Sequence, residues 1–174
     1  LARVRLDGPF TNRALLGLGW AESDASRPDR ALVPWLELRG QRLLDSAVQE
    51  SYLAVPYAYA RLASNGQAAQ QYRFAIEAYG KALELEPNNP DVLTDQGVMY
   101  RELRQFDKAL VNFRKASQVK SDHVQSLFNI GVVYASDLKR PDEAMKAWKK
   151  LIEVAPASPQ AAQAREGLTQ LMLK

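Results

Sequence analysis

The sequence predicts an all-α fold built from antiparallel pairs of helices. The chain has 174 residues, 47% of them hydrophobic, and no cysteine, so a core of ordinary size has to form without disulfides. Apolar residues recur at helical spacing over most of its length. Gly97 recurs as Gly131 and Tyr100 as Tyr134, each 34 residues later. A period of this size is typical of a solenoid, in which each helix pair buries its apolar faces against its neighbours.

The N-terminal part contains the less regular elements. Residues 1–11 are predicted to hold the tail of a preceding helix and a turn. Residues 12–45 form a first, degenerate repeat, in which Gly19 takes the small position of the pattern and Trp35 the aromatic position. Pro28 suits the first turn of the second helix of this repeat, because a proline lacks the N–H that would be unpaired there.

Residues 46–87 form a second repeat with an elongated second helix. Pro56 stands where the other repeats place a glycine. The interval from Pro56 to Gly97 is 41 residues instead of 34. The seven extra residues amount to two helical turns, which predicts a single helix of about 20 residues over 67–86.

The clearest repeats are residues 90–122 and 123–156. Ala109 recurs as Ala144 after 35 residues rather than 34, so the second copy holds one extra residue near the turn between its helices. A final helix over 158–174 is predicted to cap the last repeat, because an uncovered repeat end would expose apolar surface.

The composition changes close to the middle of the chain. Residues 1–80 hold nine arginines and no lysine, whereas residues 81–174 hold nine lysines and five arginines. One interpretation is a join of two repeat segments of different origin near Tyr79–Lys81, which would make the chain a chimera. The other is drift within one natural protein. The sequence leaves both open.

The repeated pattern resembles that of the tetratricopeptide repeat family. The matching residues of the last repeat are Leu127, Ile130, Gly131, Tyr134, Ala144, Trp148 and Pro156. The repeat before it matches with Leu93, Gln96, Gly97, Tyr100, Ala109, Phe113 and Ala116, while Ser121 stands in place of the closing proline. The resemblance implies a right-handed α-α superhelix, and the two halves resemble bacterial repeat proteins of the cell envelope and of cytochrome maturation.

The resemblance also implies a ligand-binding groove on the face formed by the first helix of each repeat. The residues expected there are Arg13, Leu16, Trp20, Leu53, Tyr57, Arg61, Asp91, Thr94, Val98, Arg101, Phe128, Asn129 and Val132. Trp20, Tyr57 and Phe128 would act as apolar anchors. Arg13, Arg61, Arg101 and Asp91 would select polar groups. The alternative is that the aromatic residues pack only against the next repeat.

A clamp for a peptide's terminal carboxylate is not expected. Some family members place lysine, arginine and asparagine in the groove for this purpose. This chain has Leu16, Leu53, Thr94 and Phe128 at those places. The groove would therefore suit an extended or helical segment with apolar anchors.

The sequence offers little for catalysis, so we expect a protein that is not an enzyme and has no cofactor or metal. His123, the only histidine, lies at a predicted helix start and reads as a capping or surface group. There is no glycine-rich phosphate loop, no His-Glu metal spacing and no serine elbow. Lys146, Lys149 and Lys150 lie near the far end of a predicted helix, where the helix dipole favours cations.

These observations predict a non-catalytic scaffold or adaptor that binds a protein or peptide segment with apolar anchors. The alternative is a self-assembly or structural module of a larger bacterial complex, which a homo-oligomer would favour. The net charge of +3 is spread along the chain, which is unlike a nucleic-acid-binding surface. The sequence contains no run of 18 apolar residues, so no membrane span is predicted. The compartment is not determined, although the resemblance favours the bacterial periplasm or envelope over the cytoplasm.

Overall fold

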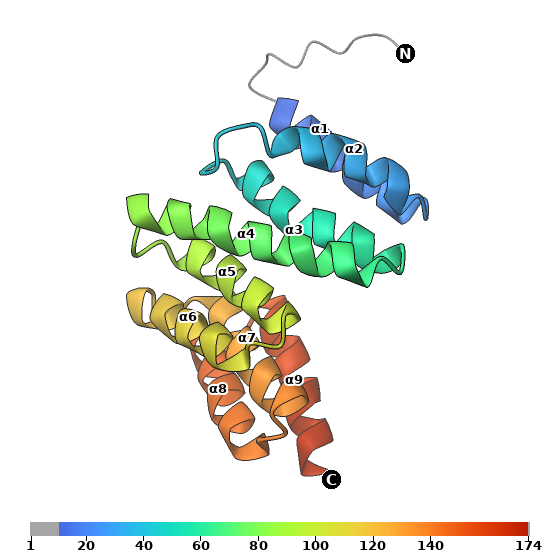
Figure 1. Ribbon diagram of the computed structural model, residues 1–174. Helices are drawn as coiled ribbons and strands as arrows, with labels where there is room; N and C mark the ends of the chain where they lie inside the picture. The colour runs from blue at the N-terminus through green and yellow to red at the C-terminus, as the bar shows by residue number, and fades with distance from the viewer. Residues whose placement is uncertain (1–10, 174) are drawn as a thin grey trace. The chain divides into compact units, whose positions relative to one another are not determined.

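The computed structural model describes residues 11–173, and in this range it contains helices and no strand (Figure 1). This confirms the all-α prediction. The predicted helix tail over residues 1–6 and the last residue of the predicted capping helix lie outside the described residues. The elements are α1 (Thr11–Asp24), α2 (Pro28–Leu38), α3 (Ser46–Arg61), α4 (Asn65–Leu85), α5 (Pro90–Glu102), α6 (Phe106–Val119), α7 (Val124–Val132), the π-helical turn η1 (Val133–Asp137), α8 (Pro141–Val154) and α9 (Pro159–Met172).

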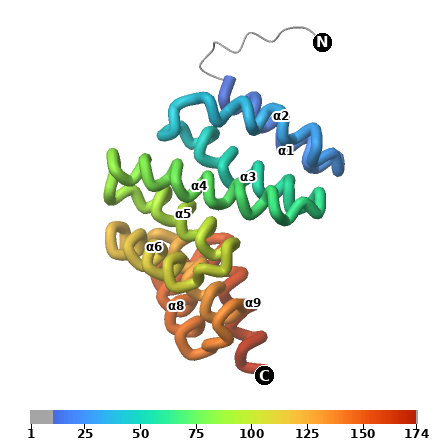
Figure 2. The backbone as a smooth tube through the Cα atoms, in the orientation of Figure 1, coloured from blue at the N-terminus to red at the C-terminus, as the bar shows by residue number. Residues whose placement is uncertain are grey.

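The chain divides into two compact units, and the boundary lies inside α4, between Ala78 and Tyr79. In the first unit, α1, α2 and α3 all contact one another. In the second, α5 packs on α6, α7 on α8, and α9 covers both α7 and α8, as the tube in Figure 2 shows. The boundary is next to the predicted join at Tyr79–Lys81, which stays a hypothesis about origin.

Local chemistry specifies the starts of α2, α3, α5, α7, α8 and α9. Prolines occupy the first turn of α2, α5, α8 and α9. A backbone N–H in that turn has no acceptor within the helix, so a residue without an N–H costs no hydrogen bond there. The side chains of Asp45, Asn89, His123 and Ser158 accept hydrogen bonds from backbone N–H groups in the first turn of the helices that follow them. Of the two roles expected for His123, the structure shows the capping role, and its side chain is only 3% exposed, so it is not a surface group.

The turn between the two helices of every repeat contains a residue in the left-handed region, and none of these residues is a glycine. They are Ser26, Ala63, Arg104 and Lys139, with φ between 56° and 60°. The next residue donates its N–H to a carbonyl of the preceding helix, as Gln105 does to Tyr100 at 2.8 Å. This is a common way to end a helix, and it usually uses glycine because a side chain is strained there.

The small position of the repeat lets the two helices of a pair approach closely. A Cβ added to Gly97 would lie 2.5 Å from the Phe113 ring. A Cβ at Gly131 would overlap the indole of Trp148 in the same way, and one at Gly19 would overlap that of Trp35. In these three repeats the glycine of the first helix therefore contacts the aromatic residue of the second helix directly.

The elongated helix is also present. Helix α4 runs over Asn65–Leu85 and has 21 residues, close to the predicted range of 67–86. Pro56 is buried within α3, and Pro34 is buried within α2.

The extra residue of the last repeat is absorbed by η1. The N–H of Leu138 donates to the carbonyl of Val133 at 2.9 Å, which is the i→i+5 bond of a π-helix. The carbonyl of Tyr134 accepts from Arg140, six residues on, whereas that of Tyr100 in the repeat before accepts from Gln105, five residues on. One wide turn thus holds the additional residue, and α8 follows the turn as α6 does in the repeat before.

Candidate binding surface

Helices α1 and α3 of the first unit present neighbouring aromatic and apolar side chains that are not fully buried. We call this the α1–α3 surface and define it by Leu16, Trp20, Leu53 and Tyr57. The ring centroids of Trp20 and Tyr57 are 6.2 Å apart, so the two aromatic residues form one continuous patch. Tyr57 is 45% exposed, and the other three side chains are half-buried.

Contacts beneath the surface hold Trp20 in place. Its ring meets that of Trp35 edge-to-face, with centroids 4.9 Å apart and an angle of 68° between the planes. Its indole Nε1 donates a hydrogen bond to Oε1 of Glu50 at 2.7 Å. A ring that is already fixed loses little conformational entropy when a partner covers it.

Charged groups frame the α1–α3 surface. Nη1 of Arg61 donates to the carbonyl of Ser23 at 3.1 Å, and its Cζ lies 5.9 Å from the Tyr57 ring centroid. The guanidinium is therefore fixed beside the exposed tyrosine. Arg13 is exposed near the start of α1.

The polar candidates of the second unit make contacts within the chain. Nε2 of His123 lies 3.0 Å from Oδ1 of Asp91, which connects the starts of α5 and α7. Nε and Nη2 of Arg101 donate to the carboxylate of Asp137 in η1 at 2.6 and 3.3 Å. The buried hydroxyl of Thr94 donates to the carbonyl of Pro90 at 2.8 Å.

The remaining candidates of the second unit are half-buried. Val98 packs against the cluster around Phe113. Phe128 and Val132 pack against the cluster around Trp148, and the Phe128 and Trp148 centroids are 6.4 Å apart. The amide of Asn129 donates to the carbonyl of Gln125 in its own helix at 2.9 Å.

Two features were not anticipated from the sequence. Arg39 lies after α2, with Cζ 4.7 Å from the centroid of the Tyr52 ring and a hydrogen bond from Nη1 to the side chain of Gln71. Burial raises the pKa of the Tyr52 phenol, and the nearby Arg39 charge lowers it by a smaller amount. The other feature is the pairing of Arg101 with Asp137. Partners 32 and 36 residues apart give no local sequence signal.

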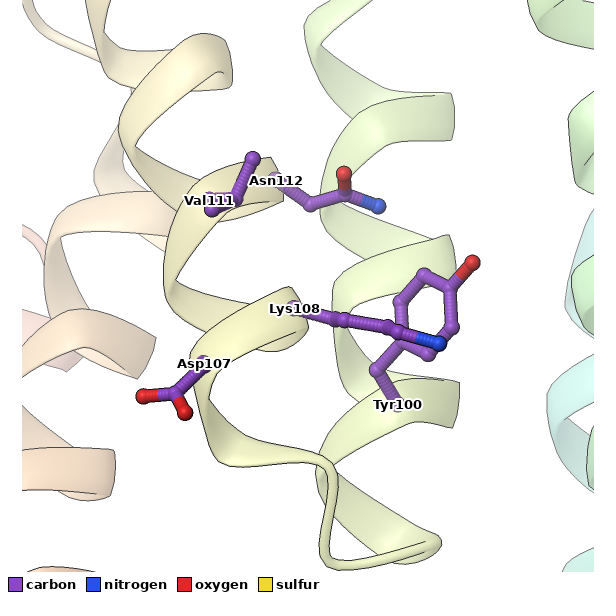
Figure 3. Close-up of a pocket in the computed structure, with 5 residues that line it drawn as sticks. All are labelled: Tyr100, Asp107, Lys108, Val111 and Asn112. Atoms are coloured by element: carbon purple, nitrogen blue, oxygen red, sulfur yellow. The ribbon is translucent and has the colours of Figure 1, made fainter.

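A cavity of about 320 Å³ lies between α5 and α6, where Figure 3 shows its lining residues. The ammonium of Lys108 lies 5.4 Å from the ring centroid of Tyr100. The amide of Asn112 donates to Oε1 of Gln96 at 2.7 Å. Asp107 points away from Tyr100 in Figure 3, and Val111 completes the lining. The polar side chains of this cavity, Lys108 and Asn112, thus contact residues of the same chain.

Neither a metal site nor a membrane helix is found in the part of the chain that is described. Residues 11–173 contain no group of three or more His, Asp or Glu side chains that could hold a metal ion. None of the helices in that range is both long enough and apolar enough to cross a bilayer.

Comparison with known proteins identifies the repeats. Residues 78–111 and residues 125–158 each match a family model described as tetratricopeptide repeat. The small glutamine-rich tetratricopeptide repeat-containing protein 2 of Mycosarcoma maydis is 32% identical over 95 residues, which are 55% of this chain and 27% of that protein. Protein O-mannosyl-transferase TMTC3 of Homo sapiens is 35% identical over 85 residues, 47% of this chain and 9% of that protein. The chain thus spans about a quarter or less of these relatives.

Solved structures share the fold. The crystal structure of MamA superposes with a TM-score of 0.53 and 24% identity, covering 85% of this chain and 80% of that one. The first TPR of Spaghetti (RPAP3), bound to the HSP90 peptide SRMEEVD, gives a TM-score of 0.53 and 19% identity over 77% of this chain and 100% of that one. At these identities the likeness shows the solenoid fold alone. The predicted bacterial origin stays a prediction.

Proposed function

Since this chain belongs to the tetratricopeptide repeat proteins, we propose that it is a non-catalytic adaptor that binds a segment of a partner protein on the α1–α3 surface. The observation that carries the proposal is the exposed Tyr57 beside the fixed, half-buried Trp20. Tryptophan, tyrosine and arginine are the residues that most often dominate binding energy at interfaces, and Arg61 adds the third of these.

The expected partner segment has an apolar anchor rather than a terminal carboxylate as its main feature. The places at which a carboxylate clamp would need cations hold half-buried Leu16 and Leu53 in the first unit. In the second unit they hold the buried Thr94 and the half-buried Phe128. The peptide in the Spaghetti complex ends in EEVD. We expect a peptide with that ending to bind this chain weakly or not at all.

A selection from displayed short random peptides, with the chain immobilised, would test the proposal. Binding of a selected peptide is then measured with the parent chain and with Tyr57→Ala and Trp20→Ala variants. We expect each variant to weaken binding at least about tenfold, as loss of an interface anchor usually does. Val33→Ala is the matched control, because Val33 is a 71% exposed apolar residue on α2, outside the α1–α3 surface.

Two results would count against the proposal. The first is that no peptide is selected. The second is that the selected peptides bind the parent, Tyr57→Ala and Trp20→Ala with the same affinity while all three proteins remain folded. The variants are checked by circular dichroism, because Trp20 also contacts Trp35.

The alternative, a self-assembly module, is favoured by a different observation. Helix α2 exposes Val33 and, at 43%, Leu36. If these residues mediate association of identical chains, the mass in solution rises with protein concentration and Val33→Asp abolishes the rise. An adaptor stays at the monomer mass of 19.5 kDa over the same range.

A further inference from the structure

An open, shallow depression of about 290 Å³ lies between α6 and α8 with α7 beneath it. We call it the α6–α8 groove. Its lining consists of Ser117, Leu127, Ile130, Tyr134, Glu143, Lys146, Ala147 and Lys150. All of these residues belong to the second unit, so the groove is separate from the α1–α3 surface.

The floor of the groove is apolar and buried. Leu127, Ile130, Tyr134 and Ala147 are buried and belong to the two hydrophobic clusters of the second unit. An apolar floor favours an apolar group of the ligand, and close packing beneath it keeps the cavity from collapsing.

The rim is positively charged. Lys146 and Lys150 are exposed and one helical turn apart on α8. Across from them, Nη2 of Arg114 donates to the hydroxyl of Tyr134. No carboxylate among residues 11–173 lies within ion-pair distance of these three cations. The acid on the rim, Glu143, is paired with Nε of Arg140 at 3.6 Å.

The helix dipole does not account for Lys146, contrary to the expectation from the sequence. Helix α8 continues to Val154, and its last turn contains no basic residue. The effect of the dipole is largely confined to the last turn, and Lys146 lies near the middle of the helix. The fold does not require a lysine there either. The position 35 residues earlier is Val111, which lines the corresponding cavity between α5 and α6 (Figure 3).

We propose that the α6–α8 groove is a docking site for an acidic segment of a partner protein. One large apolar side chain of the segment enters the cavity, and carboxylates on either side of it face Lys146 and Lys150. The cavity is at the small end of the usual range for ligand pockets, about 300–1,000 Å³. It therefore suits one anchoring side chain of a peptide better than a whole small molecule.

The test uses blocked, fluorescein-labelled peptides in which Phe, Leu or Trp is flanked on both sides by two Glu residues. Binding to the full chain is followed by fluorescence anisotropy and located by amide NMR shifts. We expect saturable binding, with shifts centred on residues 114–117 and 146–150. Replacing the central apolar residue by Ser, or the Glu residues by Lys, should weaken binding at least about tenfold.

Variants of the chain assign the binding to the groove. Lys146→Glu/Lys150→Glu should weaken it at least about tenfold, and Lys146→Met/Lys150→Met should weaken it by less. The matched control is Lys81→Glu/Lys120→Glu, which changes the charge equally at two exposed lysines of the same unit outside the groove. Ser117→Phe should block the cavity while leaving every charge in place.

Three results would overturn the proposal. The first is no binding of any acidic peptide. The second is equal weakening by the groove and control charge reversals, which would mean unspecific attraction to a basic protein. The third is binding of vesicles of anionic lipid without binding of the peptides, which would assign the cations to a membrane surface instead. None of these results bears on the α1–α3 surface.

Discussion

Gly131 lies against the indole of Trp148 so closely that no side chain fits between them. The glycine is on α7 and the tryptophan on α8, so the contact fixes the distance between the two helices of the last repeat. The opposite side of the same indole meets Gly167 of α9, where an added Cβ would lie 2.5 Å from the ring. One tryptophan therefore sets the spacing of three helices.

Gly131→Ala is expected to destabilise the second unit by about 1–3 kcal/mol, because the methyl group would force α7 and α8 apart. Gly80→Ala is the control in the same unit. Its Cβ would meet only Gln96 Nε2, at an ordinary 3.7 Å. Alanine is the better helix former by about 1 kcal/mol, so this change should raise stability. Urea unfolding measures both, and equal effects of the two substitutions would contradict the packing argument.

The left-handed turns predict a stabilising substitution. Ala63 has φ of 56°, which is strained for a residue with a side chain. Ala63→Gly should increase the free energy of unfolding of the first unit by about 0.5–1 kcal/mol, after the greater freedom of glycine in the unfolded chain is subtracted. Ala60→Gly, in the last turn of α3, should decrease it by up to about 1 kcal/mol. Ala→Gly is thus expected to raise stability at position 63 and to lower it at position 60. Thermal unfolding of the two variants measures the difference.

The pair of Arg101 and Asp137 should contribute measurably to stability, because both side chains are mostly shielded from water and two hydrogen bonds join them. We expect a coupling free energy of about 1 kcal/mol from a double-mutant cycle with Arg101→Ala and Asp137→Asn. Most exposed ion pairs give less than this and are weakened by salt. A coupling free energy near zero, or one that disappears in high salt, would contradict the prediction and show that the pair behaves like an exposed ion pair.

Stability should fall in alkaline solution partly through Tyr52. Burial raises the pKa of its phenol above 10.0, so the folded state favours the neutral form. The contribution of this group is complete below the pKa of the unfolded chain, about 10, and is lost as the pH rises through the higher pKa of the folded state. In Tyr52→Phe the decline of stability above pH 10 should be shallower. Denaturant midpoints across that pH range measure the difference, and parallel curves would contradict it.

Much of the fold was predictable because the repeat relies on short-range chemistry. The intervals between Gly97 and Gly131 and between Tyr100 and Tyr134 predicted the helix pairs, and Pro28 predicted the start of α2. The 41-residue interval between Pro56 and Gly97 predicted the length of α4. The intervals are readable because the repeat length is nearly constant along the chain, so a change in spacing reports a change in an element.

The candidate sites were less predictable because side-chain partners come from distant repeats. Arg61 and Arg101 were both expected to select polar groups in the groove, but the first bonds to a backbone carbonyl of Ser23 and the second to Asp137. The sequence explains Lys146 by the helix dipole, but α8 ends at Val154 and Lys146 lies near its middle. Which charges lack a partner depends on tertiary packing, and hydrophobic periodicity does not report it.

The π-helical turn at Val133–Asp137 has an evolutionary consequence. It shows that a repeat of this type can gain one residue and keep its pairing, because the insertion is confined to a single widened turn. Chain length can therefore change in this family without loss of register, provided that the change falls next to the turn. Two repeats that differ by one residue can therefore share the same helix pairing, and a comparison of repeats by length alone would miss the widened turn that reconciles them.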